Sequence, residues 1–136
     1  MNKLPTDRAI LKCIYLMYEP AYPGIQPESP RGENDPYLAI DVPAVAAKLG
    51  CKPELLFGRL YYHLDYKHRY KQDNGALVPL FYLKIGEKRH AVHFPYLAAV
   101  LAGHEQEHRK QLWSLGISIL ALVLSVASLA VNFYKR

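Results

Sequence analysis

Near its C-terminal end the chain carries a long run of residues without a single charged side chain, which covers positions 111–134. Within that run, Leu112–Phe133 would span roughly 33 Å as a helix, which matches the hydrocarbon core of about 30 Å in a bilayer. A helix buried inside a soluble protein is the alternative, but the rest of the chain is too short to cover so many apolar residues on all sides. We therefore predict a transmembrane helix over 112–133, with the lipid bilayer as a partner.

The flanks of this segment suit a membrane anchor but leave its orientation open. Trp113 and Tyr134 stand at its two ends, where aromatic rings favour the membrane interface. Two basic residues precede the segment and two follow it, so the distribution of positive charge gives no orientation. The N-terminal residues contain no uninterrupted apolar run typical of a signal peptide. We expect a single-pass protein with a cytoplasmic N-terminal domain and a short C-terminal tail on the far side.

The spacing of small and polar residues within the anchor predicts self-association. They recur at alternating steps of four and three, which is the seam of a left-handed helix pair. Small residues allow two backbones to approach in lipid, and hydroxyl or amide groups can bond across such an interface. We therefore predict a homodimer through the transmembrane helix; a monomeric helix whose serines bond their own backbone is the alternative. The seam consists of Ser114, Ser118, Ala121, Ser125, Ser128 and Asn132.

The residues before the anchor show helix and turn signals. Thr6 can cap a helix over 7–19, whose apolar residues repeat at helical spacing. Residues 20–36 hold five of the ten prolines and predict a loop. A short strand is expected over 37–40. A helix capped by Asp41 and ended by Gly50 is expected next, followed by a helix over 53–66 with Leu56, Leu60 and Leu64 as its core stripe.

The remaining predicted elements lie closer to the membrane anchor. Two strands are expected over 78–85 and 89–94, with a basic turn between them. A helix is expected over 96–111, and it can run on unbroken into the membrane.

The stretch AVAAKLGCKPELLFGRLYYHL, followed by two strands, resembles the winged helix-turn-helix superfamily, and the resemblance covers about residues 6–95. In it Ala46 looks like the small residue at the crossing of two helices, and Gly50 like the glycine of the turn. The resemblance implies an α+β fold, with three helices and a β-hairpin wing in residues 1–95. The juxtamembrane helix 96–111 and the anchor would follow this domain.

Charge within the folded part favours a nucleic-acid partner. Residues 59–93 carry seven basic and three acidic side chains. Basic side chains bind the phosphates of nucleic acid, and the resemblance implies duplex DNA as the partner. The leading functional hypothesis is therefore a membrane-anchored winged-helix regulator that binds DNA. Its candidate contacts are Lys52, Arg59, Lys67, Lys84, Lys88 and Arg89.

The outward face of the 53–66 helix supports a second hypothesis. With Leu60 at the centre of the buried face and 100° per residue, Arg59 is the only base-reading side chain that faces outward. Tyr61, Tyr62 and Tyr66 accompany it, and tyrosines are common in protein interfaces. The alternative function is therefore a membrane-anchored module that binds a cytoplasmic protein. The complete outward face comprises Glu54, Leu55, Gly58, Arg59, Tyr61, Tyr62, Asp65 and Tyr66.

One motif has the letters of a zinc site. Residues 104–108, HEQEH, match the H-E-x-x-H pattern, in which two histidines one helical turn apart bind zinc. The pattern prefers uncharged residues between the histidines, whereas Glu107 is charged, and no third ligand follows. We interpret this stretch as a charged collar before the membrane. No metal, cofactor or enzymatic activity is expected.

Overall fold

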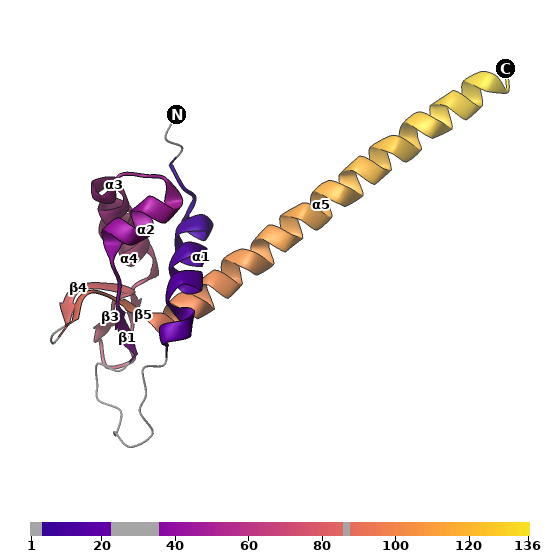
Figure 1. The fold of residues 1–136 in the computed structure, drawn as a ribbon. Helices are drawn as coiled ribbons and strands as arrows, with labels where there is room; N and C mark the ends of the chain where they lie inside the picture. Colours follow the sequence, from indigo (N-terminus) through magenta and orange to yellow (C-terminus); the bar gives the residue numbers. More distant parts are fainter. Residues whose placement is uncertain (1–3, 23–35, 86–87) are drawn as a thin grey trace. The chain divides into compact units, whose positions relative to one another are not determined.

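A computed structural model of the chain describes residues 4–22, 36–85 and 88–136 (Figure 1). The chain divides into two compact units, Met1–Ala102 and Gly103–Arg136. The first unit is an α+β structure with several helices and a small antiparallel sheet. The second consists of helix alone.

Helix α1 (Asp7–Tyr18) begins where its cap predicts. The Thr6 side chain accepts a hydrogen bond from the Ala9 amide at 3.1 Å, which satisfies one of the free donors of the first turn. A 3₁₀ turn, η1 (Glu19–Ala21), follows the helix. Most of the predicted Pro-rich loop, residues 23–35, lies outside the described part of the chain.

Strand β1 (Tyr37–Ala39) and helix α2 (Val42–Leu49) also confirm local signals in the sequence. The Asp41 side chain accepts from the Ala44 amide at 3.2 Å and caps α2. Gly50 ends the helix with φ of 73°, in the left-handed region that a residue without Cβ adopts at little cost.

A longer helical stretch follows, and its middle turn is wider than an α-helix. Its segments are α3 (Pro53–Gly58), the π-helical turn η2 (Arg59–Leu64) and α4 (Asp65–His68). The predicted stripe of Leu56, Leu60 and Leu64 is buried along it.

The wide turn changes which residues face outward. At 100° per residue, Asp65 would lie about 140° from Leu60 and face solvent. In η2 the hydrogen bonds reach five residues back, so each residue advances by less than 100°. The slower advance carries Asp65 toward the core, where it is buried, and Tyr61 is half-buried against the β4–β5 hairpin. The prediction that these two residues face outward is therefore wrong.

The buried Asp65 carboxylate joins this helix to the sheet. One oxygen accepts hydrogen bonds from the Leu80 amide at 2.8 Å and from the Phe81 amide at 3.1 Å. The other accepts from Arg69 at 2.9 Å, one helical turn further along. A buried carboxylate requires partners of this kind, and here it satisfies two buried backbone donors as well.

The main sheet has three strands in the order β1-β5-β4, all antiparallel. Strands β4 (Phe81–Ile85) and β5 (Lys88–His93) form the predicted hairpin. The predicted strand 78–85 is divided in the structure. Its first residue belongs to β3 (Leu77–Val78), which pairs with β2 (Tyr70–Lys71) in a separate small hairpin.

The core of the first unit lies where α1, α2 and the long helical stretch pack with the sheet and the start of α5. Its fully buried large side chains come from all of these elements, so no pair of them could bury the apolar surface alone. They are Ile10, Leu11, Ile14, Val45, Leu56, Leu60, Leu64, Leu80, Val92 and Leu97.

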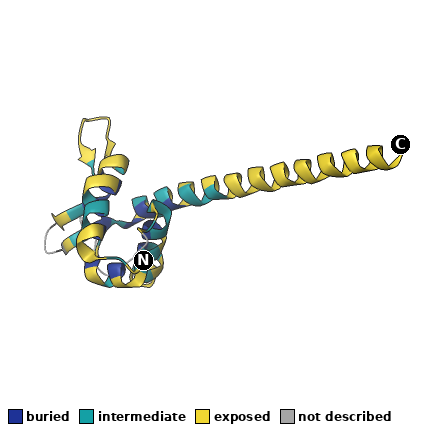
Figure 2. Cartoon of the chain, turned by 90° about the horizontal axis from the view of Figure 1, so that it is seen from above, coloured by how far each residue is buried: buried dark blue, intermediate teal, exposed yellow. Residues whose placement is uncertain are grey.

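Helix α5 (Phe94–Tyr134) is unbroken, as predicted from the sequence after Pro95. Its most apolar window has a mean hydropathy of 2.4, and none of that window is buried. Every residue from Arg109 to the end of the chain is exposed (Figure 2). By length and composition, α5 can cross a membrane.

We predict that Asp65→Ala destabilises the first unit by about 2 to 5 kcal/mol, because the Leu80 and Phe81 amides lose their acceptor while buried. Chemical unfolding of the full chain in detergent, followed by the near-ultraviolet circular dichroism of its tyrosines, measures the loss. Asp41→Ala, which removes only an exposed helix cap, should cost about 1 kcal/mol. Equal losses in the two variants would contradict the role assigned to Asp65.

Candidate functional site

Two tyrosines dominate the outer face of the long helical stretch. Tyr62 is 79% exposed and Tyr66 is 74% exposed. They lie four residues apart, on neighbouring turns, and Leu55 is a further exposed apolar residue of this stretch. The Arg69 guanidinium lies over the Tyr66 ring at 5.7 Å. We call Leu55, Tyr62 and Tyr66 the tyrosine face. The predicted exposure of Tyr62 and Tyr66 is confirmed.

Tyr61, the third predicted interface residue, has a structural role instead. Its hydroxyl lies 3.2 Å from the Tyr82 carbonyl oxygen and 2.9 Å from His90 Nδ1, so it connects η2 to the β4–β5 hairpin. Its ring packs against Phe57 with 4.6 Å between centroids. Burial raises the pKa of Tyr61 to about 12, with a smaller contribution from the Asp65 charge.

His90 marks an irregularity in the hairpin that sequence reasoning did not predict. Its φ of 53° lies in the left-handed region, where a side chain with Cβ costs about 1 to 3 kcal/mol. Tyr82 pairs with Ala91 and Lys84 with Arg89 in one constant register, and Leu83 and His90 lie between these two pairs. Burial, followed by the neighbouring Arg89 charge, lowers the pKa of His90. No turn residue in the sequence signals this conformation.

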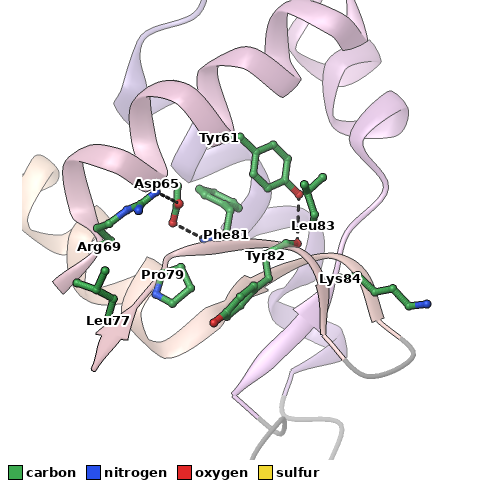
Figure 3. A pocket seen from close by; sticks show the side chains of 9 residues that line it. All are labelled: Tyr61, Asp65, Arg69, Leu77, Pro79, Phe81, Tyr82, Leu83 and Lys84. Atoms are coloured by element: carbon green, nitrogen blue, oxygen red, sulfur yellow. Dashed lines mark hydrogen bonds and ion pairs between the residues drawn. The ribbon is translucent and has the colours of Figure 1, made fainter. Parts of the chain in front are cut away.

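A cleft of about 540 Å³ runs between the helical stretch and β4 (Figure 3). Asp65 and Arg69 face it from the helix side, and Lys84 extends from its far end. The remaining lining is mostly apolar. The cleft is lined by Tyr61, Asp65, Arg69, Leu77, Pro79, Phe81, Tyr82, Leu83 and Lys84.

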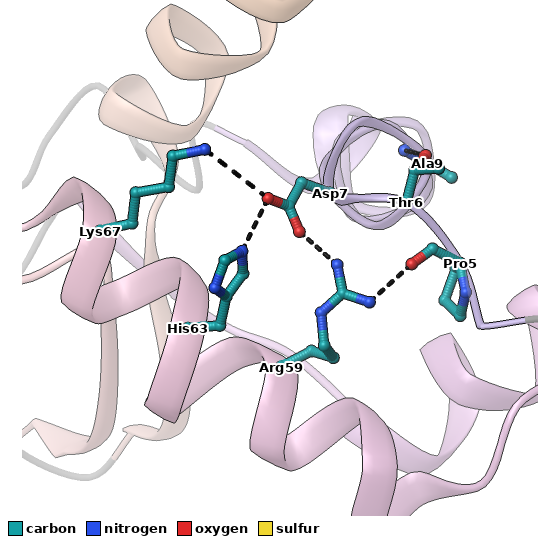
Figure 4. Close-up of polar contacts among 7 residues, drawn as sticks. All are labelled: Pro5, Thr6, Asp7, Ala9, Arg59, His63 and Lys67. Atoms are coloured by element: carbon teal, nitrogen blue, oxygen red, sulfur yellow. Dashed lines mark hydrogen bonds and ion pairs between the residues drawn. The ribbon is translucent and has the colours of Figure 1, made fainter.

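Two of the predicted nucleic-acid contacts are directed at a carboxylate of the protein itself (Figure 4). Arg59 forms an ion pair with Asp7 and donates to the Pro5 carbonyl at 2.8 Å. Lys67 Nζ lies 3.9 Å from the same Asp7 carboxylate, and His63 Nε2 lies 2.9 Å from it. These three side chains are one helical turn apart and hold the start of α1 against η2 and α4. They act first as an internal clamp.

The other predicted cations are on the surface. Lys84 and Arg89 are exposed and directly opposite each other on β4 and β5. Neither has an ion-pair partner among the described residues. Lys52 is exposed just before α3, and the side chain of Lys88 lies outside the described part of the structure. The structure therefore brings Lys84 and Arg89 together.

The predicted seam of α5 is exposed along its whole length. Ser118 donates to the Ser114 carbonyl at 2.9 Å, and Ser125 donates to the Ala121 carbonyl at the same distance. These bonds satisfy the hydroxyl protons within one helix, as the monomeric alternative requires. The hydroxyl oxygens keep the ability to accept a bond from a second helix.

Within the described residues, no group of three or more His, Cys, Asp and Glu side chains could hold a metal ion. The HEQEH stretch, residues 104–108, forms part of α5. No protein-family model, curated protein or solved structure matches the chain.

We predict that the Asp7 clamp stabilises the fold in a pH-dependent way. Burial opposes ionisation of Asp7, but hydrogen bonds and charges from His63 and Arg59 outweigh it, so the pKa of Asp7 is lowered from 3.8. A lowered pKa in the folded state gives stability that is present above the unfolded pKa and lost as the pH falls through the folded pKa. Asp7→Asn should therefore cost about 1 kcal/mol at neutral pH.

The measurement is the free energy of unfolding of the full chain and the Asp7→Asn variant from pH 7 downward. The difference should be present while Asp7 is ionised in both states and shrink below the unfolded pKa of 3.8. A difference independent of pH across this range would show that the charge of Asp7 does not contribute.

Proposed function

We propose that the chain is a membrane-anchored winged-helix protein that binds a cytoplasmic partner protein through the tyrosine face. The observation that carries this proposal is the contrast within one helix: Tyr62 and Tyr66 are free to contact a partner, whereas Arg59 is held by Asp7. Tyrosine offers a large, rigid contact area with a polar end, which suits a protein interface.

The same contrast argues against the hypothesis that this helix reads DNA bases directly. Arg59 was the one outward residue of the type that pairs with base edges, and releasing it would break its bonds to Asp7 and the Pro5 carbonyl. Glu54 is exposed on the same helical stretch and would repel phosphates.

DNA binding remains a second candidate because of Lys84 and Arg89. Two exposed cations on adjacent strands of the hairpin can contact the phosphate backbone without reading sequence. In this form of the proposal the hairpin is the wing. The order of the helices and of the hairpin in the first unit supports the winged-helix assignment for both candidates.

The proposed membrane location of the protein depends on α5. Its exposed, apolar C-terminal part would cross the bilayer once, with the folded unit in the cytoplasm and the C-terminal end of α5 on the far side. Its seam would pair two copies, because Ser and Asn bonds across such an interface contribute roughly 0.6 kcal/mol each. A dimer would present two tyrosine faces on one membrane surface.

We predict that Tyr62→Ala with Tyr66→Ala abolishes partner association without unfolding the protein, since both side chains are exposed. The tagged full chain is captured from detergent-solubilised membranes, and the proteins bound to it are identified by mass spectrometry. The matched control is Leu16→Ala, an exposed apolar residue on α1. Loss of the same partners from the control, or their retention by the tyrosine variant, would contradict the tyrosine face.

The DNA candidate is tested on the same purified proteins by titration with duplex DNA at several salt concentrations. If DNA is the ligand, Lys84→Glu with Arg89→Glu flattens the salt dependence, because each lost phosphate contact removes about 0.9 from the slope. The tyrosine variant should then bind DNA as the unmodified chain does. These two results together would identify DNA, and not a partner protein, as the ligand.

We predict that the anchor dimerises through its seam. Ser118→Leu and Ser125→Leu should each weaken the dimer, because a bulky side chain on the seam keeps two backbones apart. Leu122→Ile, off the seam, should not. Crosslinking of the full chain in membranes reports the dimer fraction, and equal dimer in all three variants would show that the seam is not the interface.

A further inference from the structure

Strand β4 leaves one edge of the main sheet open within the described structure. In the order β1-β5-β4, its only strand partner is β5. An open edge presents backbone donors and acceptors that an added strand can pair with.

The direction of the β4 backbone groups can be assigned from two hydrogen bonds. The His93 amide donates to the Leu80 carbonyl at 2.8 Å, so the carbonyl of Leu80 points toward β5. Because these groups alternate in an antiparallel ladder, those of Phe81 and Leu83 point away from β5. The Phe81 amide does so, and it donates to Asp65. Leu83 supplies the next outward amide and carbonyl, beyond the reach of that carboxylate.

The cleft described above borders this edge (Figure 3). Asp65 occupies the Phe81 amide, and the apolar lining lies on both sides of it, with Leu77 and Pro79 near Arg69 and Leu83 near Lys84 (Figure 3). Leu83 is 54% exposed, which leaves it available for contact. The volume of about 540 Å³ lies within the range of pockets that hold ligands.

The charge around the open edge favours an acidic occupant. Lys84 and Arg89 face each other across the hairpin, and like charges in such a pair destabilise a sheet unless an anion lies nearby. Arg69, the other cation of the cleft, is already paired with Asp65. Lys84, on the edge strand, is therefore the cation that an incoming segment meets first, and Arg89 adds positive charge one strand further on β5.

We propose that the cleft receives an extended, acidic segment of a partner protein, which adds as a strand to β4. Its backbone pairs with Leu83, an apolar side chain lies against the Leu83 side chain, and a carboxylate faces Lys84, with Arg89 one strand further on β5. Main-chain bonds supply affinity and the alternate side chains supply specificity. This site is separate from the tyrosine face, so it does not depend on the function proposed above.

The same charges disfavour a second copy of the chain as the occupant. Pairing of two β4 edges would bring two basic hairpins together, with Lys84 and Arg89 of each copy close to those of the other. A lysine on an edge strand commonly prevents such self-pairing. Here it would reject basic segments and identical copies while admitting an acidic strand.

The test uses the full chain in detergent micelles and a short synthetic peptide in which glutamate and leucine alternate, labelled with a fluorophore for anisotropy. Control peptides replace every glutamate with lysine, or carry N-methyl groups on one alternate set of amides. Only one of the two sets can face β4, so methylation of that set alone should abolish binding. This measurement needs no change to the protein.

Protein variants locate the site. Leu83→Pro removes the outward amide and should weaken peptide binding about tenfold or more, whereas Leu83→Val keeps that amide and should bind normally. Lys84→Glu with Arg89→Glu should also weaken binding at least about tenfold, and Lys48→Glu, an exposed cation on α2, should leave it unchanged. Tyr62→Ala with Tyr66→Ala should have no effect, which separates this site from the tyrosine face.

The proposal is overturned if the acidic peptide shows no saturable binding, or if methylation of either set of amides has the same effect. It is also overturned if the Leu83→Pro variant, shown to be folded by circular dichroism, binds the peptide normally. A dimer of the full chain that Leu83→Pro dissociates would identify a second copy as the occupant. Displacement of the peptide by duplex DNA would assign Lys84 and Arg89 to nucleic acid.

Discussion

The first unit depends on the wide turn at Arg59–Leu64 and on the carboxylate that this turn directs inward. With regular α-helical geometry, Asp65 would point to solvent, and the Leu80 and Phe81 amides would be buried without an acceptor. The π-helical turn lets one side chain serve both amides and an arginine at once. The attachment of the helix to β4, and with it the cleft between them, follows from that single rotation.

Much of the fold could be predicted because its signals are local. The caps at Thr6, Asp41 and Gly50 act on amides within a few residues, so their geometry is determined by neighbouring sequence. The outward face of the 53–66 helix could not be predicted in full, because no amino-acid pattern distinguishes a π-helical turn from an α-helix. The division of strand 78–85 has a local signal in Pro79, which cannot donate to a strand ladder, and a distant cause in Asp65, which takes the Leu80 amide.

In the candidate site, too, some features could be predicted from the sequence and others could not. Tyr62 and Tyr66 were predicted to be exposed, since they lie far from the buried stripe under either helical geometry. The pairing of Arg59 with Asp7 was not predictable, because 52 residues separate the partners and no spacing rule connects them. Lys84 and Arg89 come together through a short hairpin, which the alternation of strand residues and a turn between them do signal.

The proposed attachment to a membrane would change how strong the two proposed binding surfaces need to be. Strand β4 is five residues long, so an added strand forms only a few hydrogen bonds, each with a net contribution of about 0.5 to 1.5 kcal/mol. Two exposed tyrosines likewise make a small contact. Such sites would bind weakly in solution, but tethering two binding groups raises their effective concentration to roughly the millimolar range. A chain held on the bilayer by α5, alone or as a dimer, could then use two weak sites together and discriminate partners by charge.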